Sequence, residues 1–378
     1  MTDNEISTAE PECSGVGLVQ PKDLVFRAPF EFELGGVIPS FTLRYETYGT
    51  LNADRSNAIL VCHALSGDHH VAGRHEQGER KAGWWDAFTG PGRALDTERY
   101  FVIGVNCLGG CRGSTGPGSE NPATGAPYYL DFPQLTMRDM VRAQRELARA
   151  LGITRLHAVI GGSMGGMQGL VWAVDYPDFV RNVVPLACAA RQNPQAIAFN
   201  EVGRRAIMGD PRWRNGRYPA DDPPRNGLAV ARMLGHITYL SPQRVEEKFG
   251  RTRTQVASPE PFGAEFEVES YLTHKGSTFV ERFDANAYLY ITKAADRFDL
   301  AGGAPLESVF APVKARVTVI GFSSDWLYPP AENHAVADAL LRAGKQDTRY
   351  VEIETNAGHD AFLLPSKELV NTIRTAIA

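Results

Sequence analysis

The run Gly161-Gly162-Ser163-Met164-Gly165-Gly166 has the spacing of a catalytic serine. It fits the pattern G-x-S-x-G, in which a serine stands on a sharp turn between a strand and a helix. An apolar run at 158–160 precedes the turn and a helical pattern follows it. So tight a turn leaves room only for very small neighbours, which explains the flanking glycines. We therefore predict that Ser163 is a nucleophile rather than an incidental serine in a glycine-rich turn.

A serine hydroxyl needs a base to accept its proton, and the base needs an acid that orients it. Where this turn occurs, the three residues follow the chain order serine, aspartate, histidine. Asp325 follows the apolar run 317–321, and His359 follows the run 350–353. Both therefore stand at the carboxyl ends of expected strands, as Ser163 does. We predict a catalytic triad in which His359 is the general base and Asp325 orients it.

The same chemistry requires two backbone N–H groups that stabilise the negative oxygen of the intermediate. One comes from the residue after the nucleophile, which is Met164. The other comes from a loop that follows an early strand. The segment His63-Ala64-Leu65-Ser66-Gly67 follows an expected strand ending at Cys62, and we choose the N–H of Leu65.

Other chemistries have weaker support. His69, His70 and His75 cluster with His63 and suggest a metal, but they lack the H-E-x-x-H arrangement, so we expect surface or packing roles and no metal site. No dinucleotide fingerprint or phosphate loop is present, and we expect no cofactor.

Short apolar runs alternate with helical patterns, which is typical of a parallel sheet covered by helices on both faces. The expected strands are 58–62, 101–105, 157–160, 183–186, 317–320 and 350–353, and the expected core helices are 137–151 and 164–176. Together with the serine turn, this order predicts an α/β-hydrolase fold with a mostly parallel central sheet.

The alternation stops between 190 and 304, where the helical candidates are 197–208, 227–240 and 279–295. We interpret this stretch as an inserted helical lid over the carboxyl ends of the strands, where such sheets bind ligands. The expected division is a first core part at 15–189, the lid at 190–304 and a second core part at 305–378.

Composition narrows the class further. The chain has 378 residues, 43% hydrophobic and 22% charged, with a net charge of -5. These values fit a globular enzyme and favour neither nucleic acid nor an anionic membrane surface as a partner. The cysteines at 13, 62, 107, 111 and 188 are odd in number and scattered, and residues 1–14 lack the features of a signal peptide. We expect a cytoplasmic enzyme with reduced thiols.

Several segments resemble one family, the homoserine O-acetyltransferases. The likeness runs from about residue 18 to near the C-terminus and includes motifs of the lid, which general esterases lack. Besides the serine turn and the 63–67 loop, the matching segments are Trp84-Trp85, Gly90-Pro91-Gly92, Asn106 to Cys111, Phe199-Asn200-Glu201, Ala231-Arg232-Met233, His236 to Tyr239 and Gly358-His359-Asp360.

The resemblance implies a ping-pong reaction, the first step of methionine biosynthesis. Ser163 would take an acetyl group from acetyl-CoA, and the hydroxyl of L-homoserine would then attack the acyl-serine. By the same resemblance, Arg232 would hold the homoserine carboxylate and Asp360 its ammonium group. The family also implies a homodimer, which we expect to form through the lid helices.

The acyl donor depends on one position. In succinyl-using members of the family an arginine comes two residues after the triad aspartate, and here that position is Leu327. An apolar wall suits a methyl group and disfavours an unpaired buried carboxylate, so we expect acetyl-CoA. A homoserine O-succinyltransferase, a serine O-acyltransferase, an esterase and a binding protein that has lost its chemistry remain the alternatives.

Overall fold

An eight-stranded sheet forms the centre of the protein, which is described here by a computed structural model at residues 15–254 and 261–378. The strand order is β1-β4-β6-β5-β7-β8-β9-β10. Pairings from β6 to β10 are parallel, whereas β4 pairs antiparallel with β1 and β6. The bounds are β1 Lys22–Phe26, β4 Phe41–Tyr48, β5 Ala58–Cys62, β6 Phe101–Val105, β7 Leu156–Gly162, β8 Val180–Leu186, β9 Arg316–Phe322 and β10 Arg349–Ile353. The predicted α/β-hydrolase fold with its mostly parallel sheet is confirmed.

Both faces of the sheet are covered, so its central strands are apolar on both sides. All of β5 is buried, with Leu60 and Cys62 packed in one hydrophobic core and Ile59 and Val61 in the other. Successive strand residues point to opposite faces, which is why a continuous apolar run rather than an alternating one predicted this strand.

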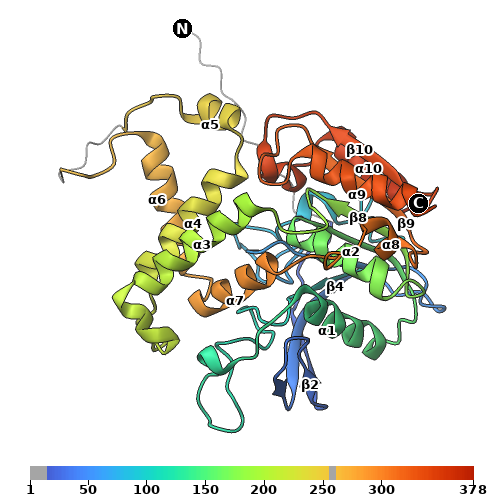
Figure 1. The fold of residues 1–378 in the computed structure, drawn as a ribbon, viewed down its shortest axis with the longest axis horizontal. Coiled ribbons are helices and arrows are strands. Elements are labelled where there is room, and N and C mark those ends of the chain that lie inside the picture. The colour runs from blue at the N-terminus through green and yellow to red at the C-terminus, as the bar shows by residue number, and fades with distance from the viewer. Residues whose placement is uncertain (1–14, 255–260) are drawn as a thin grey trace.

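Helices follow the strands on each side (Figure 1). One core contains residues of α1 Met137–Ala150, α2 Met164–Asp175, α8 Leu306–Phe310 and α9 Pro330–Arg342. The opposite core contains residues of η1 Asp86–Phe88, η4 Gly358–Leu363 and α10 Lys367–Ala376. The smaller elements are β2 Phe30–Glu31, β3 Val37–Ile38 and η2 Tyr129–Asp131. Among the described residues, no helix combines the length and apolar character needed to cross a bilayer.

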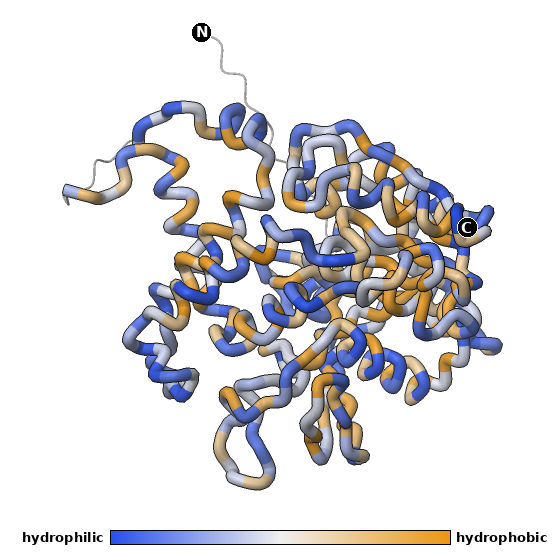
Figure 2. Tube along the Cα trace, viewed as in Figure 1, coloured by the Kyte–Doolittle hydropathy of each residue, from blue (hydrophilic) through white to orange (hydrophobic). Residues whose placement is uncertain are grey.

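Between β8 and β9 the chain forms a group of helices that stands beside the sheet, on the left of Figure 1. Its members are α3 Pro194–Gly209, η3 Pro211–Gly216, α4 Arg225–Tyr239, α5 Pro242–Phe249, α6 Glu267–Val280 and α7 Ala285–Asp296. Hydrophobic and hydrophilic residues alternate along these helices (Figure 2), as expected of helices that each bury one face. We call this group the lid helices.

One predicted helix of this region is wrong. The sequence pattern indicated a single helix over 279–295, but the structure ends α6 at Val280 and begins α7 at Ala285. Asp284 has an extended backbone, and its side chain accepts a hydrogen bond from the Ala287 N–H, so it caps a new helix. Periodicity alone could not reveal this break, because the apolar residues of both helices keep a helical spacing.

Candidate active site

Ser163 stands at the sharp turn that its motif predicts. The turn joins β7 to α2, and Ser163 has φ 58° and ψ -124°, a conformation that is strained for a residue with a side chain. Its N–H donates to the carbonyl of Leu186 at 2.9 Å. A Cβ atom at Gly161 or Gly165 would lie 2.5 or 2.1 Å from the carbonyl oxygen of Cys62. The neighbouring strand β5 therefore excludes any larger residue beside the serine.

His359 and Asp325 come from separate segments and meet in the interior. Asp325 follows β9, and its Oδ2 lies 2.7 Å from Nδ1 of His359 in η4. Both residues are buried. Oδ1 of Asp325 accepts the N–H groups of Leu327 and Tyr328, both at 3.0 Å. The carboxylate is thus held from one side by its own loop and faces the imidazole with the other oxygen.

The groups around His359 determine the direction in which its pKa shifts. Burial disfavours the charged imidazolium, but the negative charge of Asp325, its hydrogen bond to the ring and the nearby Asp360 outweigh burial and raise the pKa of His359. An imidazole in this setting binds a proton more readily than an ordinary histidine, which suits a general base.

Ser163 and His359 both line one pocket, which we call the charged pocket. The side chains of Ser66, Arg232, Arg282 and Asp360 line it as well. The structure therefore brings together the predicted nucleophile, the predicted base and both residues predicted to bind the acceptor.

Two arginines converge on the loop before the oxyanion site. Nη1 of Arg232, on α4, donates to Oγ of Ser66 at 3.0 Å, and Nη1 of Arg282 donates to the carbonyl of the same residue at 2.9 Å. The guanidinium carbon of Arg232 lies 4.7 Å from the ring centre of Phe279, which fixes its orientation. Within the described residues neither guanidinium forms an ion pair with a carboxylate, so the pocket offers positive charge to an anionic ligand.

Arg282 was not predicted from the sequence, where it is one of many charged residues. Burial and the nearby Arg232 lower its pKa. Asp360 adds a negative group to the same pocket, and burial raises its pKa even though His359 and Arg232 act in the opposite direction. A pocket with cationic and anionic groups at different points matches the two charges of an amino acid.

A second pocket meets the first at Leu65, Ser163 and Tyr239, and is lined entirely by uncharged residues, among them Gln192 and Asn200; we call it the uncharged pocket. It encloses about 50 Å³, and Leu65, Met164 and Leu327 contribute to its wall. Leu327 is only 9% exposed. The donor-selecting position predicted from the sequence therefore lies against the space beside the nucleophile.

The two N–H groups predicted to form the oxyanion site belong to residues of this wall. Neither the Leu65 nor the Met164 amide donates to another residue among those that the structure describes. Met164 is the first residue of α2, where N–H groups lack partners within the helix. Both amide N–H groups are thus free to donate hydrogen bonds to a negative oxygen of a ligand.

Known proteins resemble this chain over nearly its whole length. Residues 57–365 match the alpha/beta hydrolase fold family. A homoserine O-succinyltransferase of Acidithiobacillus ferrooxidans is 54% identical over 97% of this chain and 96% of its own. A homoserine O-acetyltransferase of Methanohalobium evestigatum is 55% identical over 94% of this chain and 72% of its own.

Solved structures agree on the fold. Homoserine O-acetyltransferase from Bacillus anthracis superimposes with a TM-score of 0.88 at 32% identity, covering 95% of this chain and 98% of its own. Esterase E22 superimposes with a TM-score of 0.87 at 32% identity, covering 96% of this chain and 100% of its own. The chain therefore belongs to the α/β-hydrolase fold family and, within it, to the homoserine O-acyltransferases.

Proposed function

We propose that this protein is a homoserine O-acetyltransferase, which transfers the acetyl group of acetyl-CoA to the hydroxyl of L-homoserine and so begins methionine biosynthesis. The observation that carries the proposal is the charged pocket. Ser163 and His359 share it with Arg232, Arg282 and Asp360. A nucleophile and base that open onto fixed charges of both signs suit transfer to an amino acid.

The first half-reaction forms an acyl-serine. His359 takes the proton of the Ser163 hydroxyl, and Oγ attacks the thioester carbon of acetyl-CoA. The Leu65 and Met164 N–H groups stabilise the negative oxygen that develops, as oxyanion donors do. The carbon–sulfur bond then breaks, and the leaving thiolate receives the proton from His359.

The second half-reaction consumes the acyl-serine. L-homoserine enters the charged pocket with its carboxylate on Arg232 and its ammonium group on Asp360. His359 takes the proton of the homoserine hydroxyl, whose oxygen attacks the acetyl carbon. Collapse of this intermediate breaks the bond to Ser163, and the serine oxygen regains its proton from His359. Fixing the acceptor next to the ester gives its hydroxyl an advantage over water.

The uncharged pocket supports acetyl-CoA as the donor. A volume of about 50 Å³ accommodates only a few water-sized groups. A succinyl group would place a carboxylate among uncharged lining residues, which is costly without a partner. Overall similarity does not separate the two donors, because relatives of nearly equal identity are named for each. We therefore assign the donor from Leu327 and its pocket.

The second candidate is an esterase, which the close superposition of esterase E22 favours. Both activities form an acyl-serine and differ in what attacks it. A matrix of acetyl-CoA and succinyl-CoA against L-homoserine, L-serine and water tests the proposal, with CoA release and O-acylated product measured together. We expect the highest kcat/KM for acetyl-CoA with L-homoserine. CoA release that is equally fast without an amino acid would identify an esterase instead.

A further inference from the structure

A second cluster of reactive side chains lies away from Ser163, around a buried carboxylate. Glu46, on β4, is fully buried. Within the described residues, its ion-pair partners are three imidazoles, those of His69, His70 and His75. The sequence pattern assigned these histidines to surface or packing roles and did not include Glu46, which is distant in sequence. Only folding brings the carboxylate to them.

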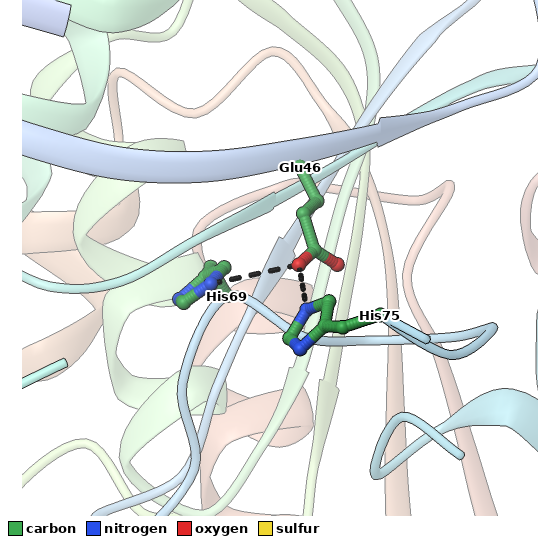
Figure 3. Close-up of side chains that lie close together, drawn as sticks. All are labelled: Glu46, His69 and His75. Atoms are coloured by element: carbon green, nitrogen blue, oxygen red, sulfur yellow. Dashed lines mark hydrogen bonds and ion pairs between the residues drawn. The ribbon is translucent and has the colours of Figure 1, made fainter. Parts of the chain in front are cut away.

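The two carboxylate oxygens have different surroundings. Oε2 is held by hydrogen bonds to the hydroxyl of Tyr48 at 2.5 Å and to Nδ1 of His70 at 3.0 Å. Oε1 shares a hydrogen bond with Nε2 of His75 at 2.6 Å, which a metal ion between them would replace, and it lies 3.5 Å from Nε2 of His69 (Figure 3). Tyr48 and His70 thus orient the carboxylate, while its other oxygen and two imidazole nitrogens converge on one point.

This arrangement is a set of metal ligands. We propose that Glu46, His69 and His75 bind one divalent transition-metal ion of the Zn²⁺ class through Oε1 and the two Nε2 atoms. The ligand atoms of these three residues lie within 4.8 Å of one another. Two ligand atoms on one tetrahedral Zn²⁺ stand roughly 3.3 Å apart, given bond lengths of about 2.0–2.2 Å. The distances of 2.6 and 3.5 Å from Oε1 bracket that value.

The surroundings fit such an ion in two further ways. The buried carboxylate needs a positive partner, and neither Lys nor Arg supplies one among the described residues. His69 is buried, so its Nε2 faces the carboxylate and not solvent. Two imidazoles and a carboxylate select Zn²⁺ and its neighbours over Mg²⁺ or Ca²⁺, which prefer oxygen ligands. Tyr48 and His70 would act as the outer partners that orient a metal-binding carboxylate.

The position of the proposed metal site indicates that the ion would have a structural role. The loop carrying His69 and His75 continues from Leu65 and Ser66, which line the charged pocket. The carbonyl of His70 accepts the N–H of Trp84, another residue of that pocket. A metal ion would tie this loop to β4 and thereby hold the oxyanion loop in place, without touching a substrate.

The test uses the full-length protein without a histidine tag, stripped with a chelator and dialysed. Zn²⁺ is titrated calorimetrically, and Co²⁺ is added as a spectroscopic probe of the ligands. We expect one equivalent of either ion, a visible Co²⁺ absorption and a rise in Tm of about 3 °C or more at saturation. Mg²⁺ should produce none of these changes.

Variants locate the ion. Loss of an outer partner alone weakens metal binding by roughly 10- to 100-fold. Glu46→Gln and His75→Gln each remove a direct ligand, so each should weaken Zn²⁺ binding by at least as much. His334→Gln is the matched control, because His334 is an exposed histidine paired with Asp338 at 3.3 Å. Absence of stoichiometric Zn²⁺ binding by the wild-type protein overturns the proposal, as does unchanged binding by folded Glu46→Gln and His75→Gln. If these variants do not fold, ¹H NMR of the Co²⁺-loaded wild-type protein decides, since histidine ligands give strongly shifted ring-proton signals and the absence of such signals overturns the proposal.

Discussion

The backbone N–H of Leu327 donates to Oδ1 of Asp325 at 3.0 Å, so the predicted donor-selecting residue is anchored by the same carboxylate that contacts His359, the predicted general base. The other carboxylate oxygen contacts Nδ1 of His359. Leu327 also lines the uncharged pocket beside Ser163. This hydrogen bond holds the Leu327 backbone next to the predicted triad, and we therefore expect donor choice to respond to its side chain.

Leu327→Arg should move donor preference from acetyl-CoA toward succinyl-CoA. The new guanidinium would pair with the succinyl carboxylate and remove the cost of leaving it unpaired. The measurement is the ratio of kcat/KM for the two donors with saturating L-homoserine. Leu327→Met is the control for size, and it should keep the acetyl preference. A native enzyme that prefers succinyl-CoA would show that this position does not select the donor.

Ser163→Ala should reduce turnover by roughly a thousandfold or more, as loss of a triad serine does. Incubation of the wild-type protein with acetyl-CoA alone should add one acetyl mass to the peptide that contains Ser163. Mass spectrometry of digested protein checks both variant and wild type. Ser66→Ala is a useful comparison, because Ser66 lines the same pocket but should not become acylated. Acetylation at Cys107 or Cys111 would refute the assignment.

Arg232→Ala should impair the acceptor step while acyl-enzyme formation survives. Removal of a charged partner in a desolvated pocket costs about 2–5 kcal/mol, which is reflected in the KM for homoserine. Rapid-quench measurement of the acetyl burst separates the two steps. Arg205→Ala is a matched control on the lid helices, since Arg205 is 75% exposed and paired with Glu201. Unchanged homoserine kinetics in Arg232→Ala would exclude this role.

Acylation should lose rate as the pH falls, because His359 must be neutral to accept the serine proton. Asp325 and Asp360 raise the pKa of His359 despite its burial, so this loss should begin at a higher pH than for an ordinary histidine. Asp360→Asn removes one negative neighbour and should shift the acid limb to lower pH. The burst rate with acetyl-CoA, measured across pH without homoserine, reports this shift free of acceptor binding. An acid limb that does not shift in Asp360→Asn would show that Asp360 does not raise the pKa of His359.

We expect a homodimer through the lid helices. Val202 on α3 and both Val230 and Ile237 on α4 have exposed side chains, 56%, 47% and 46% respectively. Val230→Glu should weaken association by burying a charge in the interface. Val25→Glu on β1, at 48% exposure, is the matched control outside the lid helices. Sedimentation at micromolar concentration checks both variants, and a wild-type mass of one chain would contradict the expectation.

The fold and the meeting of the predicted triad residues were predictable because most of their signals are local. Strands such as 58–62 are marked by continuous apolar runs, since both of their faces are buried. The serine turn is marked by glycines, since a Cβ at Gly161 or Gly165 would collide with Cys62. Chain order then selected Asp325 and His359, which lie 2.7 Å apart in the structure. The prediction of a single helix at 279–295 failed, because the N-cap Asp284 starts a new helix within an otherwise continuous helical spacing of apolar residues.

What only the tertiary structure decided is which distant side chains share a space. Arg282 has no distinguishing sequence neighbours, yet it donates to the carbonyl of Ser66, which lies far away in the chain. Glu46 likewise meets His69 and His75 only after β4 has packed near the loop that follows β5. Sequence periodicity records which face of an element is buried, but not which other element covers it. Charge pairing and ligand geometry depend on which elements pack together, because electrostatic and coordination energies require contact at a few ångströms.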